Sequence, residues 1–349
     1  MSDVILESLE LLSQGSRLNQ ERAYQLMDAV MRGEATPAQI GGVLMALRVR
    51  GESVDELTGF ARAMRDHATV VPIRKRPVID TCGTGGDRSF TFNISTVSAF
   101  VVAGAGLHVA KHGNRSATSK SGSADLLEAL GIPIQNDPQV VAELVDEVGF
   151  GFLFAQQVHG SMRHAGPTRR ELGVRTVFNI LGPLTNPCAP EYQLVGVFAR
   201  DWVRPITEVL ARLGVKRAMV VHGHGGLDEV SLSGPTEYGL VIDGQVQYGR
   251  LTPEDLGLLR YPVGSFAGAD PATNARICRT IISERVPGPV TDMVLANAGV
   301  ALYVGGAAAS AEDGVKLARQ ALNSGSAEDI LEALIARAKA SPEGERRDA

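Results

Sequence analysis

The chain has 349 residues, of which 44% are hydrophobic and 21% charged, proportions that are typical of a soluble globular protein. Its formal net charge of -5 argues against general binding to nucleic acids or anionic membranes, although a local basic cluster can still bind an anionic substrate. The three cysteines are too few for a disulfide framework and favour a reducing cytoplasm, and we expect neither a signal peptide nor a membrane-spanning segment.

The first 70 residues predict a small bundle of four helices. Leucines recur at helical spacing close to the N-terminus. Thr36, followed by a proline, marks the start of the third helix, and Ser53 with Glu56 forms a capping box at the start of the fourth. The stretch 70–77, which contains two prolines, is the expected linker to the next domain.

Beyond residue 77 the pattern changes to short apolar runs that are mostly separated by helical segments. This alternation is typical of an α/β fold with a largely parallel central sheet covered by helices. The runs occupy residues 78–80, 107–110, 151–155, 192–198 and 217–223. A hairpin is expected over 238–249 with Asp243-Gly244 at its turn, and the C-terminal part is helical again.

The basic segment 159–187 interrupts this alternation. Its first part has a helical pattern and its second part is rich in turn residues. It is either a surface insertion or a part of the N-terminal helical domain, which would then be discontinuous. Its arginines 163, 169 and 170 would ordinarily lie on a solvated face, but one of them could grip a carboxylate or phosphate if the segment faces a ligand.

The glycine-rich stretch DTCGTGGD, residues 80–87, lies between an apolar strand and an apolar helix. Backbone N–H groups at such a turn, together with the N-terminus of the next helix, can bind an anion. Asn93, Ser95 and Thr96 at that helix start can hydrogen-bond phosphate oxygens. The spacing matches neither a Walker A loop nor a Rossmann fingerprint, and a tight turn without a ligand is the alternative interpretation.

A second polar loop follows the run 107–110, at the end of a strand where open α/β sheets bind ligands. Residues 111–123 combine Lys111, His112 and Arg115 with five side-chain hydroxyls, a composition that suits a polyanion. Further on, Asp228 and Glu229 are adjacent carboxylates after another strand, and such a pair beside a phosphate is a common way to hold Mg²⁺. A solvated loop and an ordinary acidic turn are the alternatives.

Five segments in a fixed order give the chain a family resemblance: DTCGTGGD, FNIST, KHGNRS with KSGSADLLEALG, MRHAGPTRRELGVRTVFNILGPLTNP and GLDEVSL. Together they resemble the anthranilate phosphoribosyltransferases, which join anthranilate to phosphoribosyl pyrophosphate in tryptophan biosynthesis. The resemblance extends to about residue 339. It implies a homodimer, an active site between two domains, and an oxocarbenium-like transition state without a covalent enzyme intermediate. The implied domains are a helical one from residues 1–70 and about 160–187, a larger donor-binding one from 78–159 and 188–340, and a tail at 341–349.

The resemblance also implies a role for individual residues. The donor, phosphoribosyl pyrophosphate, would be bound by Gly83, Gly86, Asp87, Thr91, Asn93, Ile94, Ser95, Thr96, Lys111, His112, Gly113, Asn114, Arg115, Ser116, Ser119 and Ser123. Anthranilate would be bound by Gly83, Asn114, Arg169 and Gly182, and two Mg²⁺ ions by Ser95, Asp228 and Glu229. No residue is implied as a certain catalytic group, and Lys111, His112 and Arg169 would position the substrates.

Two residues depart from the family pattern. Family members commonly carry glycine directly after GTGGD, where this chain has Arg88, and Phe90 is bulkier than usual. Arg88 would be strained at positive φ and would otherwise offer a phosphate contact. A pyrimidine nucleoside phosphorylase, which shares the fold, and a nucleic-acid-binding relative are the alternative functions. The carboxylate pair argues against the first, and the acidic composition argues against the second.

Overall fold

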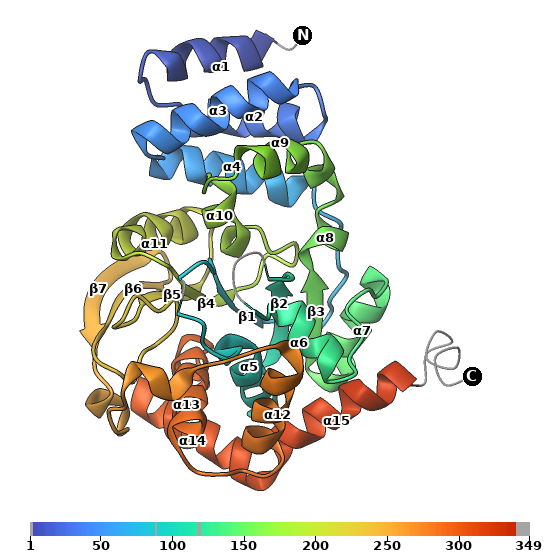
Figure 1. The fold of residues 1–349 in the computed structure, drawn as a ribbon, viewed down its shortest axis with the longest axis vertical. Coiled ribbons are helices and arrows are strands. Elements are labelled where there is room, and N and C mark those ends of the chain that lie inside the picture. Colours follow the sequence, from blue (N-terminus) through green and yellow to red (C-terminus); the bar gives the residue numbers. More distant parts are fainter. Residues whose placement is uncertain (1–2, 88, 117–119, 340–349) are drawn as a thin grey trace.

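A computed structural model describes residues 3–87, 89–116 and 120–339, and the structural statements below concern these residues. Arg88, Ser119 and the tail 341–349, which the sequence singled out, lie outside the described residues. The chain forms a helical bundle that is stacked on a larger part built around one sheet (Figure 1).

The N-terminal bundle has the four helices that the sequence predicts. They are α1 (Asp3–Ser13), α2 (Gln20–Met31), α3 (Pro37–Arg50) and α4 (Val54–Asp66). The Thr36 side chain accepts a hydrogen bond from the Gln39 backbone, and Ser53 and Glu56 form a capping box, so both predicted helix starts are confirmed. The predicted linker 70–77 is free of helix and strand.

The larger part contains a seven-stranded sheet in the order β3-β2-β1-β4-β5-β6-β7. Its strands are β1 (Val78–Gly83), β2 (His108–Gly113), β3 (Phe150–Phe154), β4 (Tyr192–Gly196), β5 (Arg217–His222), β6 (Thr236–Ile242) and β7 (Gln245–Leu251). The first five are parallel, and β6 and β7 form the predicted antiparallel hairpin. The order of the strands reverses between β1 and β4, and open α/β sheets bind ligands at such a point.

Helices cover both faces of this sheet, which confirms the predicted α/β class. On the face away from the bundle, α5 (Ile94–Gly104) and α13 (Pro289–Val304) pack against the strands (Figure 1). Helices α12 (Pro271–Ile282), α14 (Ala311–Ser324) and α15 (Ser326–Lys339) pack on α5 and α13. Three further helices of this part are α6 (Ser123–Ala129), α7 (Pro138–Val148) and α11 (Val203–Arg212). Side chains of α11 join those of β4 and β5 and of the N-terminal bundle in one buried cluster, so the bundle and the sheet share a core. None of the helices in the described ranges is both long and apolar enough to cross a membrane.

The segment after β3 runs back to the N-terminal bundle. It forms α8 (Ala155–Val158), η1 (Gly160–Arg163), α9 (Gly166–Leu172), α10 (Phe178–Leu181) and η2 (Gly182–Leu184). Helix α9 packs on α3 and α10 packs on α4 (Figure 1). Ala165, Phe178 and Leu181 are buried in the same cluster as the bundle's own apolar side chains. This packing supports a discontinuous helical domain over a surface insertion.

Candidate active site

The glycine turn leaves β1 at the point where the strand order reverses. Gly83, the last residue of β1, is paired with Gly196, the last residue of β4. A Cβ atom on Gly196 would lie 1.5 Å from the carbonyl oxygen of Asp228, and one on Gly83 would lie 2.5 Å from its Oδ2 atom. The absence of side chains at the two strand ends therefore lets the loop that carries Asp228 cross directly over them.

The two predicted carboxylates lie against the two segments that the sequence proposes for phosphate binding. The backbone N–H of Gly85 donates to Oδ2 of Asp228 at 2.7 Å, and that of Ser95 donates to Oε1 of Glu229 at 3.2 Å. The structure thus brings together the three predicted magnesium ligands, Ser95, Asp228 and Glu229, at the start of α5.

The carboxylates in this site have raised pKa values, because they are buried close to one another. Burial, and after it the neighbouring Asp87 carboxylate, raises the pKa of Asp228 to about 7. Burial and then Asp228 raise the pKa of Glu229 well above its ordinary value. Within the described ranges, no three His, Cys, Asp or Glu side chains form a group that could hold a metal alone, so hydroxyl or substrate oxygens would have to complete it. Crowded carboxylates next to a hydroxyl form a hard oxygen set that fits Mg²⁺.

Lys111 lies under this acidic cluster and belongs to a strand, not to the second polar loop. Strand β2 continues to Gly113, beyond the apolar run, so that Lys111 is a buried strand residue. Its ammonium group donates to the carbonyl of Thr81 and, at 3.3 Å, to the Ser95 hydroxyl. Burial lowers the pKa of Lys111, and the nearby Asp80 carboxylate opposes that effect. Lys111 therefore orients Ser95 from the interior of the sheet.

His112 points to the opposite face of the sheet, as the next residue of a strand must. Its buried ring makes an edge contact with the His159 ring, with 5.1 Å between the centroids. Burial, and then His159, lowers the pKa of His112 to about 3, while a hydrogen bond to the Gly182 carbonyl opposes this shift. His112 is therefore a neutral ring beside Gly182, and the structure does not bring it to the carboxylates.

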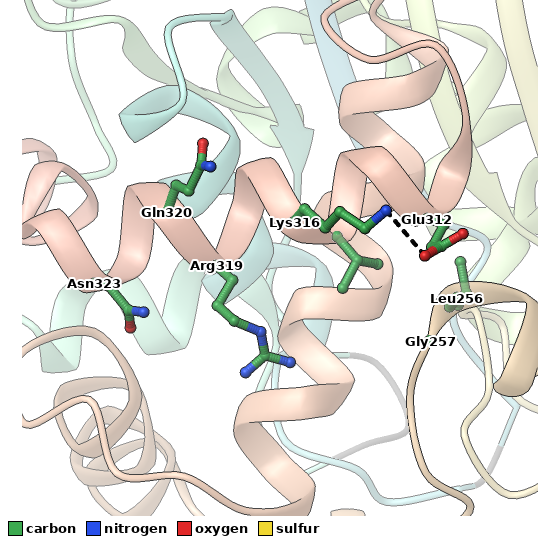
Figure 2. A pocket seen from close by; sticks show the side chains of 8 residues that line it. Leu256, Gly257, Glu312, Lys316, Arg319, Gln320 and Asn323 are labelled. Carbon is green, nitrogen blue, oxygen red and sulfur yellow. Dashed lines mark ion pairs between the residues drawn. The ribbon is translucent and has the colours of Figure 1, made fainter.

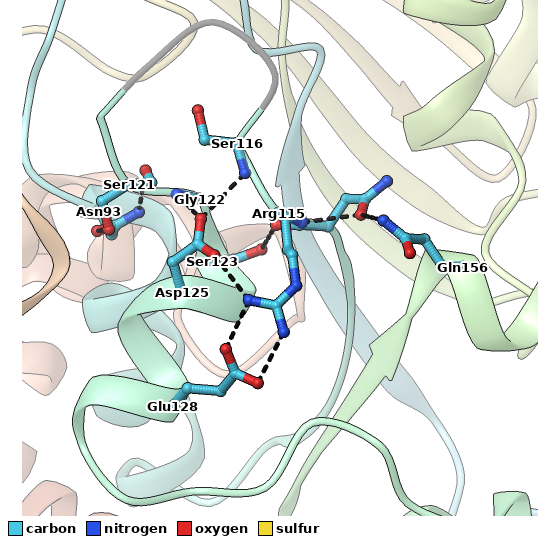
Figure 3. A network of polar contacts seen from close by, with 10 residues as sticks. Asn93, Arg115, Ser116, Ser121, Gly122, Ser123, Asp125, Glu128 and Gln156 are labelled. Carbon is cyan, nitrogen blue, oxygen red and sulfur yellow. Dashed lines mark hydrogen bonds and ion pairs between the residues drawn. The ribbon is translucent and has the colours of Figure 1, made fainter.

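The second polar loop is shaped by hydrogen bonds from α6 and α5 (Figure 3). The Asp125 carboxylate accepts the backbone N–H groups of Ser116 at 3.1 Å and of Gly122 at 2.8 Å. The Ser123 hydroxyl donates to the Asn114 carbonyl at 3.2 Å. These bonds bring the predicted donor ligands Asn114, Ser116 and Ser123 together as one loop beside α6.

The side chain of Arg115 is placed differently from its predicted role as a phosphate ligand. Its guanidinium group pairs with Asp125 at 3.0 Å and with Glu128 at 2.6 Å (Figure 3). Those carboxylates neutralise the cation in this structure, so Arg115 stabilises the loop and does not present a free positive charge.

The predicted residues at the start of α5 differ in which of their groups can reach a ligand. Ile94 is buried in the core, so only its backbone can face a ligand. The Asn93 side chain is engaged with Ser121 at 3.1 Å and Asn274 at 2.9 Å. Thr96 is also buried, and its hydroxyl oxygen has no hydrogen-bond partner among the described residues. Thr91 pairs with Ala267 in an isolated bridge.

Arg169 and Gly182 occupy the helical side of the site. Arg169 is half-buried and forms no ion pair with any described carboxylate, and burial lowers its pKa. Its guanidinium carbon lies 6.0 Å from the centre of the Phe178 ring. A Cβ atom on Gly182 would meet no heavy atom within 4 Å, so there is open space beside this residue. A desolvated cation without a partner is suited to binding a carboxylate ligand.

The chain around Gly182 is held by side chains from both the helical bundle and the sheet. We call residues 182–185 the strap, because hydrogen bonds from both parts reach its carbonyls. Gln193 of β4 donates to the Pro183 carbonyl at 2.9 Å, and Arg65 of α4 donates to the Leu184 carbonyl at 2.7 Å. The Gly182 and Thr185 carbonyls partly offset the effect of burial on the pKa values of His112 and His159. The strap therefore joins the helical bundle to the sheet beside the open space at Gly182.

Sequence reasoning missed Arg175, which lies between α9 and α10. Its guanidinium group donates to the carbonyl of Gly86 and lies 4.2 Å from the centre of the Phe198 ring. The only signal in the sequence is a single arginine inside the apolar run VRTVF, where a solvated charge is not expected. The three arginines that the sequence did single out include two, Arg163 and Arg170, that are exposed.

A surface cavity of about 340 Å³ lies apart from these residues, between η4 (Glu254–Leu256) and α14. Side chains of both charges line it, and Lys316 pairs with Glu312 at 3.0 Å across its rim (Figure 2). None of the predicted substrate or metal ligands lines it, so we do not assign the active site to this cavity.

Comparison with known proteins agrees with this site. Residues 6–68 match the helical bundle domain of a glycosyl transferase family, and residues 75–328 match the α/β domain of that family. An anthranilate phosphoribosyltransferase of Thioalkalivibrio sulfidiphilus is 48% identical over 329 residues, which cover 94% of this chain and 97% of the relative.

Solved structures give the same result. The crystal structure of anthranilate phosphoribosyltransferase from Thermus thermophilus has a TM-score of 0.90 and 45% identity, and the match covers 95% of this chain and 99% of that one. The Saccharomyces cerevisiae enzyme, solved in complex with PRPP and Mg, has a TM-score of 0.88 and 28% identity, with 98% and 99% covered. On these matches over nearly its full length, the chain belongs to the anthranilate phosphoribosyltransferase family.

Proposed function

We propose that the protein transfers the phosphoribosyl group of phosphoribosyl pyrophosphate to the amine of anthranilate, which gives N-(5-phosphoribosyl)anthranilate and pyrophosphate in tryptophan biosynthesis. The observation that carries this function is the meeting of the glycine turn, the start of α5 and the Asp228–Glu229 pair where the strand order reverses. A family relative solved with PRPP and Mg supports the same substrate class.

The donor would be bound largely by backbone groups. The glycine turn, with Gly85 and Gly86 at positive φ, lets the main chain approach a phosphate closely. The 11-residue helix α5 adds the partial positive charge of its N-terminus on the same side. Ser121 bonds Asn93 at the start of α5, so the described part of the second polar loop adjoins this space, and its hydroxyl and amide groups would bond the remaining phosphate oxygens.

Asp228, Glu229 and Ser95 would hold the metal, and we propose two Mg²⁺ ions. When bound, the ions supply positive charge to the oxygens of the departing pyrophosphate. The chain's own contribution is to fix these ligands, since Gly85, the α5 backbone and Lys111 each bond one of the three.

The acceptor would lie between the strap and the second polar loop. The Arg169 guanidinium, which pairs with no described carboxylate, would bind the anthranilate carboxylate, and the open space at Gly182 would admit the ring. Asn114 would help to orient it. An aromatic amine is weakly basic and attacks without strong proton abstraction, so positioning and charge neutralisation supply most of the catalysis.

We also propose how the protein is organised. Residues 1–70 and about 160–187 would form one helical domain, supported by the shared core of α9, α10 and the bundle, and 78–159 with 188–340 the donor-binding domain. A homodimer would meet through the helical domain, where Leu6 and Val49 are 49% and 82% exposed. The three cysteines are free thiols, which supports a cytoplasmic location.

The test is a fluorescence assay of the purified protein with anthranilate, phosphoribosyl pyrophosphate and Mg²⁺. Anthranilate fluorescence should fall only when all three are present. Constant fluorescence under these conditions would refute the proposal. Phosphorolysis of thymidine or uridine without Mg²⁺ would instead identify a nucleoside phosphorylase, and salt-dependent DNA binding without turnover a nucleic-acid-binding relative.

A further inference from the structure

Arg175 connects two parts of the molecule that are proposed to bind different substrates. It belongs to the segment that carries Arg169 and Gly182 on the acceptor side. Its guanidinium group nevertheless donates to the Gly86 carbonyl in the glycine turn, residues 83–87, which we call the donor turn because it is proposed to bind the donor. Among the side-chain hydrogen bonds of the described residues, this is the only one from the segment 159–187 to the turn 83–87. Arg175 is half-buried, and no described carboxylate forms an ion pair with it.

The position of the guanidinium group is set by Phe198. The centre of the ring lies 4.2 Å from the guanidinium carbon, a cation–π contact that favours the flat group of arginine over the ammonium of lysine. Phe198 itself is tied to the turn, because its backbone N–H donates to the Thr84 hydroxyl at 3.0 Å, and the N–H of Thr84 donates to the Gly196 carbonyl at 2.9 Å. The arginine therefore rests on a platform that is continuous with the donor turn.

Holding one carbonyl fixes a whole peptide group. The carbonyl of Gly86 and the N–H of Asp87 belong to one planar trans peptide unit and point in opposite directions. Because Arg175 holds the carbonyl, the N–H of Asp87 points away from Arg175. Gly86 has a φ of 74°, and the free chain populates other conformations of a glycine peptide almost equally. The hydrogen bond selects one of them.

We propose that Arg175, stacked on Phe198, is a positioning residue that presents the Asp87 amide to the pyrophosphate of the donor. This inference rests on the proposed function of the turn as the donor site. The interaction acts through the backbone, so the charge of Arg175 is not itself a ligand. It also makes the geometry of the donor turn depend on the placement of the segment that binds the acceptor.

Two variants separate this role from direct binding of phosphate by the arginine. Phe198→Leu removes the aromatic platform and keeps the charge, and Arg175→Lys keeps the charge and loses the planar fork. A positioning role predicts that both raise the KM for phosphoribosyl pyrophosphate about tenfold, the cost of one charge-assisted hydrogen bond, with a smaller change in kcat and in the anthranilate KM. The double variant should cost less than the sum of the two, because each removes the same contact.

The exposed Arg170→Lys variant in the same segment is the matched control and should leave all constants unchanged. Thermal unfolding of each variant separates a folding defect from a local one, and Phe198→Leu keeps the test open if a change at Arg175 prevents folding. The positioning role would be overturned if Phe198→Leu kept the wild-type donor constants. It would also be overturned if Arg175→Lys kept them while Arg175→Gln lost donor affinity. Calorimetric titration of the protein with phosphoribosyl pyrophosphate, in the presence of Mg²⁺, measures the affinity of the donor site even if anthranilate proves not to be the acceptor.

Discussion

The backbone N–H of Gly85 donates to the Asp228 carboxylate across 2.7 Å, and the two residues are 143 positions apart in the chain. A hydrogen bond thus couples the glycine turn directly to the acidic pair. A residue that binds metal and a residue that binds phosphate are usually mutated as separate groups. Here we expect changes in one to alter the other.

Removing either acidic charge should impair metal-dependent turnover. For Asp228→Asn and Glu229→Gln we expect kcat/KM at saturating Mg²⁺ to fall at least about a hundredfold, because the charge on the departing pyrophosphate is less well neutralised. Titration of the rate with Mg²⁺ should also show a higher half-saturating concentration. The matched control is Glu312→Gln on the exposed surface of α14. A normal magnesium dependence in both site variants would contradict the assigned ligands.

Removing the Arg169 charge should affect the acceptor more than the donor. Arg169→Ala removes a half-buried cation that forms no ion pair among the described residues, so little folding stability is lost with it. We expect the anthranilate KM to rise about ten- to hundredfold and the donor KM to change much less. Arg170→Ala, at the adjacent exposed position, should behave like the wild type in the same steady-state assay. An unchanged anthranilate KM in Arg169→Ala would refute the role.

Two glycine substitutions should give opposite results. A methyl group at Gly182 meets open space and the residue has a φ of -46°, so Gly182→Ala should keep its thermal stability and raise the anthranilate KM. At Gly196 the methyl group would lie 1.5 Å from the Asp228 carbonyl, so Gly196→Ala should lose at least about 2 kcal/mol of unfolding free energy. Urea unfolding with steady-state kinetics measures both. Equal stability of the two variants would show that the packing is not as described.

The elements and the location of the site could be predicted from the sequence because their signals are local. The Ser53–Glu56 capping box and the Asp243-Gly244 turn each lie within a few residues, and both are present in the structure. The glycine turn and the acidic pair can also be recognised from a few adjacent residues, and parallel strands place such segments at one edge of a sheet. The orientation of individual side chains did not follow in the same way.

The features that could not be predicted depend on distant partners. Arg115 looked like a phosphate ligand until α6 placed Asp125 and Glu128 beside it. Arg175 is defined by its contacts with Gly86 and Phe198, which no spacing in the sequence connects. The face to which a strand residue points also depends on register, and a shift of one residue separates the environments of Lys111 and His112.

The strap should make stability sensitive to acid. Burial lowers the pKa of His159 to about 4, well below the 6.5 of an exposed imidazole, so the unfolded chain binds the proton first as the pH falls. Its contribution is therefore fully present above pH 6.5 and is lost towards pH 4, by roughly 3 kcal/mol in total. His112, whose pKa is lowered from 6.5 to about 3, acts in the same direction over that whole interval.

The measurement compares the melting temperature of the wild type with that of His159→Asn between pH 7.5 and 4.5. Asparagine keeps a donor for the Thr185 carbonyl but does not titrate in this range. The wild type should lose stability more steeply as the pH falls. The difference between the curves also removes the titration of Asp228, whose raised pKa lowers stability as the pH rises. Parallel curves would show that His159 does not contribute.

The strap also has a consequence for the order of folding. Its bond from Arg65 to the Leu184 carbonyl closes a loop of 119 residues, and its bond from Gln193 ties it to β4. Such closure is entropically costly until the intervening chain is compact, so the strap should assemble in one of the last steps. In refolding from urea, the circular dichroism of the helices should return before the anthranilate-dependent activity. Arg65→Lys should accelerate unfolding and leave the rate of helix formation unchanged, because contacts that form late in folding mainly affect the unfolding rate. The acceptor site would then be active only in chains in which the strap has already joined the sheet to the helical bundle.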